Sequence, residues 1–188
     1  QRLISSPLIN LSTLVKSPAM LFVDGRLGLP AYHEWIGRFG EFLRIDASQV
    51  IDKRRMSSGR GAIQPVVFSD GPQEASAFFR QTRSSSQPKQ IPISETKDAG
   101  QSWVVTTDLE IPNPNSALAA LTLANGARLM VLNNIEAGRY RLVMVMRESN
   151  SAQWQVIQVL EDDESLANDQ RREFSYPYLI SANGEDAH

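Results

Sequence analysis

The sequence predicts an all-β fold, a partial β-propeller of about three and a half four-stranded antiparallel blades. Four apolar runs end in Asp-Gly or Asn-Gly, a dipeptide that favours the tight turn of a β-hairpin. The runs end at Gly25, Gly71, Gly126 and Gly184, so the intervals between them are 46, 55 and 58 residues. No segment repeats its apolar residues with the period of about 3.6 that marks an amphipathic helix. A β-sandwich built from similar hairpins is the structural alternative.

Further strand-like segments follow the hairpins. Third strands are expected at 40–46, 90–96 and 139–148, and a fourth strand at 153–161. Repeats of this length with about four short strands are typical of propeller blades. The charged segment 161–172 is the best helix candidate, and we interpret it as a connector between blades.

This count gives three blades and the start of a fourth, whereas a closed propeller has roughly four to eight. We therefore interpret residues 1–188 as a single domain that is a fragment of a larger propeller. Such a chain is expected to pair with the missing part of the propeller or to associate with itself.

The composition argues against several classes of function. The net charge of −2 disfavours a protein that binds nucleic acid through bulk attraction to phosphates. The apolar runs are far shorter than the roughly 18 residues of a membrane-spanning helix, so no membrane partner is expected. Cysteine is absent, and His33 and His188 are far apart, so no metal or other cofactor is expected. The chain starts at Gln1 without a Met and therefore does not define its compartment; a periplasmic or secreted location stays open.

The segment Thr96–Trp103, with the sequence TKDAGQSW, is predicted to form a hairpin turn. Asp98 can accept hydrogen bonds from turn amides, and Gly100 tolerates a positive φ. Ser102 can close the loop with its hydroxyl, and Trp103 buries a large ring at the start of the next strand. The alternative is an ordinary surface turn beside a core tryptophan. Arg147–Trp154 is interpreted as a degenerate copy of the same turn.

The spacing Thr-x-Asp-x-Gly-x-Ser-Trp matches the Asp-box of sialidases and related propellers, S/T-x-D-x-G-x-T/S-W. With LVKSP, LPAYHE, SGRGAIQP, IPNPNSALAALTLANGARLMVLNN and FSYPYLI, it makes the chain resemble the bacterial predicted neuraminidases with BNR (Asp-box) repeats. The similarity runs from about Leu14 to His188 and would cover the C-terminal half of a six-bladed sialidase-like propeller.

The resemblance implies a neuraminidase, a glycoside hydrolase that is exo-acting on sialic acid or a related acidic sugar. The general acid of sialidases is an aspartate from an early blade, so it is expected outside this chain. The fragment alone is therefore expected to be inactive. Two alternatives stay open: a non-catalytic glycan-binding or scaffold propeller, and a lyase that acts on acidic polysaccharides.

The innermost strand of each propeller blade starts at the mouth of the central channel, so residues just before the apolar runs are expected to converge there. These residues are Lys16, Arg60, Gln64, Asn115, Ser116 and Tyr176. Cations, amides and a phenol suit an acidic sugar, whose carboxylate binds arginine through paired hydrogen bonds. Arg60 is the best candidate for that contact, and Arg80 in FFRQTR is the second. Alternatively, Arg60 is a surface loop residue, Arg80 an exposed strand end and Lys16 a solvated side chain.

The resemblance also implies a catalytic pair. Sialidases use a tyrosine nucleophile, which a nearby glutamate activates by removing the phenol proton. Tyr176 in FSYPYLI resembles the nucleophile, and Glu34 in LPAYHE resembles its base. Alternatively, Tyr176 is a packing aromatic beside Pro177, and Glu34 is part of a salt bridge at the rim.

Overall fold

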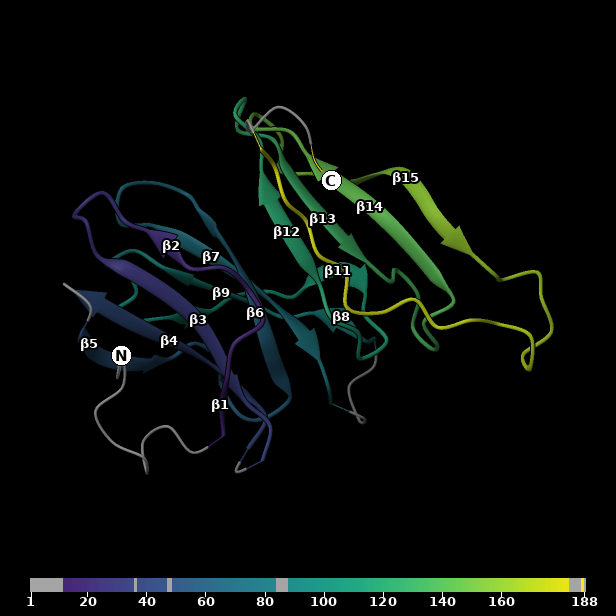
Figure 1. Ribbon diagram of the computed structural model, residues 1–188, viewed down its shortest axis with the longest axis horizontal. Helices are drawn as coiled ribbons and strands as arrows, with labels where there is room; N and C mark the ends of the chain where they lie inside the picture. The colour runs from purple at the N-terminus through teal and green to yellow at the C-terminus, as the bar shows by residue number, and fades with distance from the viewer. Residues whose placement is uncertain (1–11, 36, 47–48, 84–87, 183–186, 188) are drawn as a thin grey trace. The chain divides into compact units, whose positions relative to one another are not determined.

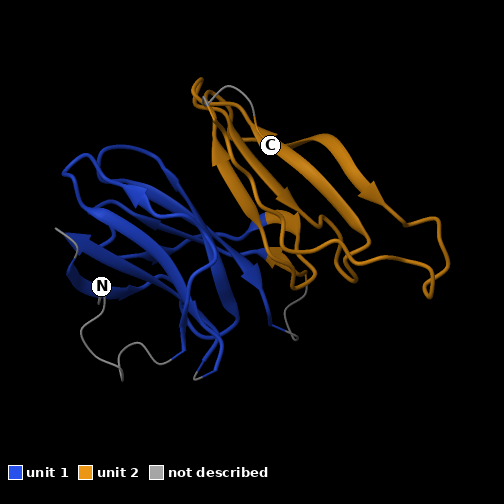
Figure 2. Ribbon diagram, viewed as in Figure 1, with its two compact units in different colours: residues 1–84, 91–109 blue, residues 85–90, 110–188 orange. Residues whose placement is uncertain are grey.

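The fold is seen in a computed structural model, which describes residues 12–35, 37–46, 49–83, 88–182 and 187. The chain forms two compact units, residues 1–84 with 91–109 and residues 85–90 with 110–188 (Figure 2). Within the described ranges the regular structure is entirely β, and no helix is present that could span a membrane. The all-β class predicted from the sequence is confirmed.

The first unit holds two antiparallel meanders with four strand positions each (Figure 1). In the first meander, β3 pairs with β4 and β4 with β5, while the short strands β1 and β2 share the other edge of β3. The second meander has the order β6-β7-β9-β10. A parallel bridge between β4 and β6 joins the two meanders into one nine-stranded sheet. The strands are β1 (Thr13–Leu14), β2 (Met20–Leu21), β3 (Leu27–His33), β4 (Phe39–Asp46), β5 (Gln49–Arg55), β6 (Ala62–Ser69), β7 (Ala75–Gln81), β9 (Ile93–Thr96) and β10 (Val104–Val105).

The second unit contains a third four-stranded antiparallel meander, with the order β12-β13-β14-β15. Its strands are β12 (Ala119–Thr122), β13 (Arg128–Leu132), β14 (Arg141–Arg147) and β15 (Gln155–Asp162). A separate two-stranded sheet pairs β8 (Gln90–Ile91) with β11 (Leu109–Pro112). The third and fourth strands predicted from the sequence fall on β4, β8 with β9, β14 and β15.

Three of the predicted hairpins are present. At Asp24-Gly25 the amide of Phe22 donates to the carbonyl of Arg26 over 3.0 Å, and Gly25 has a φ of +82°. The turn at Asn125-Gly126 repeats this pattern, with the same φ at its glycine. Both are three-residue hairpins that end in a left-handed residue, a position that glycine fills without strain. The turn at Asp70-Gly71 joins β6 to β7. The fourth predicted turn, Asn183-Gly184, lies outside the described residues.

Each unit has a core of its own. In the first unit, Phe42 and Phe79 are fully buried and pack with Phe22, Met56 and small alanines. In the second unit, Leu129 and Val131 belong to a buried cluster that also includes Ala119 and Leu179. β3 and β4 each contain four consecutive buried residues, so both faces of this part of the sheet are covered.

Two expectations from the sequence differ from the structure. The charged segment 161–172 forms no helix: residues 161 and 162 end β15, and turns follow. The fourth apolar run also forms no strand within the described part, residues 178–182. Tyr176 has a left-handed φ of +57°, and Pro177 lacks an amide donor, so the chain bends where a ladder would begin. Leu179 instead packs against the third meander.

Candidate functional site

Three of the predicted site residues share an uncommon backbone conformation. Gln64, Asn115 and Tyr176 have φ values of +49°, +63° and +57°, respectively. Among the described non-glycine residues, only Ser12 and Ala99 also have a positive φ. A left-handed residue costs about 1–2 kcal/mol, although asparagine tolerates it better. Such strain persists where the surrounding structure fixes it, and it is concentrated at functional sites.

Gln64 lies in a β-bulge of β6. The β6–β7 register runs from Ile63 opposite Arg80 to Val66 opposite Phe78, so two residues of β6 face one of β7. A bulge re-aims a side chain, and bulges are frequent beside active sites. The amide of Gln64 accepts a hydrogen bond from Arg80 Nη1 over 3.2 Å and donates to the hydroxyl of Tyr32 over 3.3 Å. All three side chains belong to buried residues. The guanidinium of Arg80 is thus held by a buried polar chain, and Arg80 is not an exposed strand end.

A second polar cluster lies in the other unit, around the fully buried Asn133. The Ser116 hydroxyl donates to Asn133 Oδ1, and the Asn133 amide donates to the carbonyls of Arg141 over 2.7 Å and Phe174 over 3.1 Å. Ser116 is itself buried, so its hydroxyl serves this cluster. Arg139 Nη2 donates to the carbonyl of Asn115 over 3.2 Å.

The segment that carries Tyr176 is tied to this cluster by its backbone. The amide of Phe174 donates to the carbonyl of Arg139 over 2.8 Å, and its carbonyl accepts from Asn133. Two residues later, Tyr176 is 59% exposed in this chain. The structure therefore brings Asn115, Ser116 and the chain that leads to Tyr176 together.

The other predicted residues lie in the first unit. Glu34 is exposed directly after β3. Arg60 is exposed between two glycines of positive φ, and its carbonyl accepts from Arg83 Nε over 3.2 Å. Lys16 is partly buried, and this burial lowers the pKa of its ammonium group. Glu34 and Tyr176 belong to different units, so their pairing stays a prediction.

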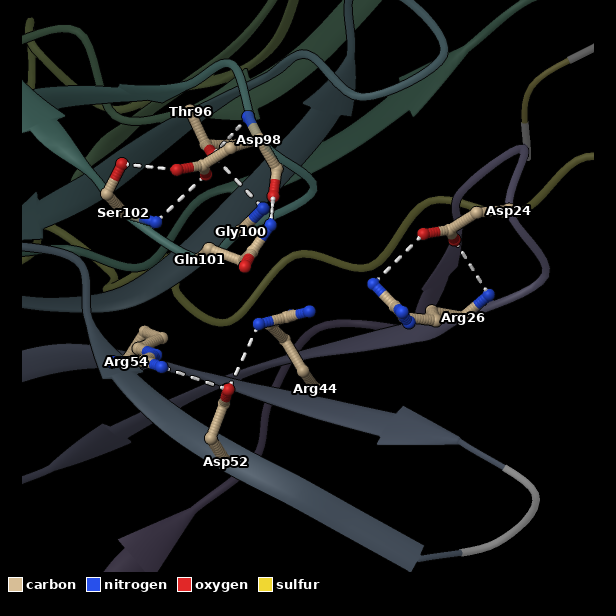
Figure 3. A network of polar contacts seen from close by, with 10 residues as sticks. All are labelled: Asp24, Arg26, Arg44, Asp52, Arg54, Thr96, Asp98, Gly100, Gln101 and Ser102. Carbon is tan, nitrogen blue, oxygen red and sulfur yellow. Dashed lines mark hydrogen bonds and ion pairs between the residues drawn. The ribbon is translucent and has the colours of Figure 1, made fainter.

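The turn at Thr96–Trp103 connects the third and fourth strands of the second meander, β9 and β10 (Figure 3). Asp98 accepts from the amide of Ser102 over 2.9 Å and from its hydroxyl over 2.5 Å, while Thr96 Oγ1 lies 2.8 Å from the carboxylate. Partial burial disfavours the charge of Asp98, but hydrogen bonds from Ser102, Thr96 and Gln101 outweigh it and keep its pKa below the ordinary value. The predicted hydrogen-bonding role of Asp98 in this turn is confirmed.

Two aromatic rings fix the Asp98 turn to the core. Trp103 packs edge-on against Phe42, with 5.2 Å between ring centroids. Gly100 has a φ of +78°, and a Cβ there would lie 2.5 Å from the Phe42 ring, so only glycine fits. The turn at Arg147–Trp154 stands at the same topological place, between β14 and β15, and Arg147 lies 5.6 Å over the Trp154 ring.

Sequence reasoning missed three residues of these clusters: Tyr32, Asn133 and Arg139. Tyr32 precedes His33 in LPAYHE. Neighbouring residues of a strand point to opposite faces of the sheet, so the two rings could have been assigned to different faces from the sequence. Asn133 directly follows the apolar run of β13, and a polar residue at that place was a usable signal. Arg139 had no distinguishing signal, because it lies in the β13–β14 connection, far from Asn115 in the sequence.

The family model for the BNR repeat-like domain matches residues 1–188. The chain belongs to the BNR repeat-like family. Its fold is similar to that of sialidases of known structure. A leech intramolecular trans-sialidase, solved with 2,7-anhydro-Neu5Ac, is 15% identical with a TM-score of 0.60, over 89% of this chain and 26% of that one. The NanB sialidase of Streptococcus pneumoniae, solved with 2-[(3-chlorobenzyl)ammonio]ethanesulfonate, is 15% identical with a TM-score of 0.60, over 86% and 25%.

A third solved structure, the Hadza microbial sialidase Hz136, is 11% identical with a TM-score of 0.56, over 76% of this chain and 30% of that one. This chain therefore spans between a quarter and a third of the length of these sialidases. No curated protein sequence matches it. At such identities the likeness establishes the fold, whereas activity depends on the residues of the site.

Proposed function

We propose that the chain is the C-terminal part of a six-bladed sialidase-like propeller, and that the whole protein is a glycoside hydrolase. It would remove sialic acid or a related acidic sugar from the end of a glycan. Three consecutive four-stranded meanders support a reading as propeller blades. The Asp98 turn, between the third and fourth strands of its meander, is interpreted as an Asp-box.

The observation that carries the proposal is the repeated left-handed backbone at Gln64, Asn115 and Tyr176. Asn115 and Tyr176 precede apolar runs, and Gln64 lies in a bulge near the start of one. Because a left-handed non-glycine residue is rare, its recurrence at or near the start of successive apolar runs indicates that the same backbone conformation is required at each of these places. A site assembled from one residue per blade would require this conformation, since each side chain must turn toward the channel.

Arginines supply the contact to the sugar carboxylate. Arg80 is the best oriented candidate, because Gln64 and Tyr32 hold it in a buried chain. Arg139 is added to the predicted set, because it contacts Asn115 in the second unit. Arg60 and Lys16 complete the cationic surface. Gln64 and Ser116 position their neighbours, and Asn115 is proposed to contact the sugar hydroxyls.

In the proposed reaction, Glu34 removes the phenol proton of Tyr176, and the phenolate attacks the anomeric carbon. The glycosidic bond breaks, a glycosyl-tyrosine forms, and water then releases the sugar. The leaving oxygen takes its proton from a general acid expected outside this chain. The test is steady-state kinetics of the natural full-length protein on sialosides. Tyr176→Phe removes only a hydroxyl and should lower kcat by several orders of magnitude, with stability unchanged.

Tyr178→Phe is the matched control, since Tyr178 is 65% exposed and lies two residues farther along the same segment. It should keep full activity. Glu34→Gln should lower kcat as Tyr176→Phe does. Equal kcat values for the wild-type protein and Tyr176→Phe would refute the assignment.

The rival function is a glycan-binding propeller without catalysis. The observation that favours it is the exposure of both Glu34 and Tyr176, since water screens the pair and weakens its activation. This protein would bind an acidic sugar but release no product. Isothermal titration calorimetry with 3′-sialyllactose would then show saturable binding without turnover, and Arg60→Met would weaken it.

A further inference from the structure

A pocket of about 350 Å³ lies in the second unit, and of its lining residues only Arg139 belongs to the site proposed above. One wall is the β13–β14 connection, with Gly138, Arg139 and Tyr140. The other wall is the segment after β15, with Asn168, Arg171 and Arg172. The two walls are joined by backbone hydrogen bonds, so the pocket is a built feature and not a gap between independent loops.

The segment after β15 is fixed by an ion pair between the buried Asp163 and the exposed Arg172. Asp163 is 4% exposed, and its carboxylate accepts from Arg172 Nε and Nη2 over 2.9 Å each. Hydrogen bonds from Arg172 lower the pKa of Asp163 to about 2. The amide of Asp163 also donates to the carbonyl of Tyr140 over 2.9 Å. The charge of Arg172 is therefore balanced by Asp163, and the carboxylate of Glu161 also lies 3.5 Å from its Nη2.

Arg171 contributes positive charge that these contacts do not balance. Its guanidinium lies 4.2 Å over the Tyr140 ring, and it donates to the carbonyls of Leu166 over 3.0 Å and Glu164 over 2.7 Å. Neutral acceptors and an aromatic face orient the group but leave its charge in place. Arg139 has a carboxylate partner at 3.6 Å, but that partner, Glu173, is 71% exposed. Arg172 pairs with both Asp163 and Glu161, and Arg139 pairs with Glu173. Arg171 is therefore the arginine of this pocket whose described contacts include no carboxylate.

The pocket adjoins the chain that carries Tyr176. Arg139 lines the pocket, and its side chain also contacts Asn115. Glu173 lines the pocket too, and Phe174 is bonded to the Arg139 backbone two residues before Tyr176. A ligand in the pocket would therefore lie next to a sugar held near Tyr176.

We propose that this pocket binds the carboxylate of the second sugar of the substrate, the one next to the sugar that is released. The preferred substrates are then glycans with acidic groups on successive sugars. This inference rests on the proposed function, because it specifies the substrate of the same site. It predicts that the full-length protein hydrolyses an α2,8-linked disialyl lactose with a higher kcat/KM than 3′-sialyllactose.

Asn168→Asp tests the role of the pocket. Asn168 is exposed, so the variant is expected to fold, and it places a negative charge in the pocket. The ratio of kcat/KM for disialyl over monosialyl lactose should fall roughly 3- to 10-fold, because one charge pair at contact distance has about that effect near water. The effect should shrink in 1 M salt, which screens exposed charges. Asn150→Asp, the same change on the exposed β14–β15 turn of this unit, is the control and should keep the wild-type ratio.

Equal kcat/KM for the two wild-type substrates, or equal ratios for Asn168→Asp and Asn150→Asp, would overturn the proposal. A protein that hydrolyses neither substrate would refute the proposed function instead. In that case, the affinity of the pocket for disialyl lactose is measured by isothermal titration calorimetry. Weaker binding by Asn168→Asp than by Asn150→Asp supports it, and equal binding refutes it.

Discussion

Replacing Asp98 by alanine should destabilise the first unit without affecting sugar binding. The change removes the acceptors for the Ser102 amide, the Ser102 hydroxyl and the Thr96 hydroxyl. A hydrogen bond to a charged group contributes about 1.5–3 kcal/mol at most, and water replaces part of the loss at this partly exposed turn. We therefore expect the free energy of unfolding to fall by about 1–3 kcal/mol. For a chain of this size, that corresponds to about 2–4 °C in Tm for each kcal/mol.

Urea and thermal unfolding of the wild type, Asp98→Ala and Asp98→Asn measure this effect. The asparagine variant keeps one oxygen for the Ser102 amide, so it should fall between the other two. Because the folded pKa of Asp98 is depressed, the advantage of the wild type over Asp98→Asn is present above the unfolded pKa near 4 and is lost as the pH falls through the folded pKa. Full stability together with lost sugar affinity in Asp98→Ala would mean that the turn is a binding site, and the structural reading would be wrong.

Three further predictions concern the turns and the strained residues. Asp163→Asn should remove the part of the stability that the wild type loses between about pH 4 and pH 2, as acid titrations followed by circular dichroism would reveal. Gly25→Ala should lower the free energy of unfolding by about 1–2 kcal/mol through backbone strain alone, since no atom lies within 4 Å of the added Cβ. Gly126→Ala should lower it further in urea unfolding, because its Cβ would lie 3.1 Å from Ser149. Tyr176→Gly should match or exceed the wild type in Tm while Tyr178→Gly falls below it, and the reverse order would show that Tyr176 is not strained.

The hairpins and the Asp98 turn were predictable because their chemistry is local. Asp-Gly and Asn-Gly determine a turn within a few residues, and the turn at Thr96–Trp103 contains both its donors and its acceptor. Apolar runs between such turns indicated strands, and most of them are present. The innermost strand of the first meander is less regular than expected, because β1 and β2 share the edge of β3.

The side-chain clusters depend on contacts that spacing does not reveal. The bulge at Gln64 turns its amide toward Arg80 and Tyr32, and no sequence pattern announced that bulge. Ser116 was expected to face a ligand, but its hydroxyl is used by Asn133, which follows the neighbouring strand β13. The fourth apolar run has the composition of a strand, but its described part, residues 178–182, forms none. A strand also needs a neighbouring strand whose backbone groups can accept and donate its hydrogen bonds.

If Tyr176 is the nucleophile of a sialidase-like hydrolase, a covalent glycosyl-tyrosine intermediate forms during turnover and can be trapped. The natural full-length protein would be mixed with a sialoside, stopped with acid during turnover and digested with trypsin. The peptide that begins at Glu173 contains both Tyr176 and Tyr178, which fragment ions distinguish. We expect one added sialosyl group on Tyr176, and none in Tyr176→Phe. Turnover without this adduct, or an adduct on another residue, would contradict it.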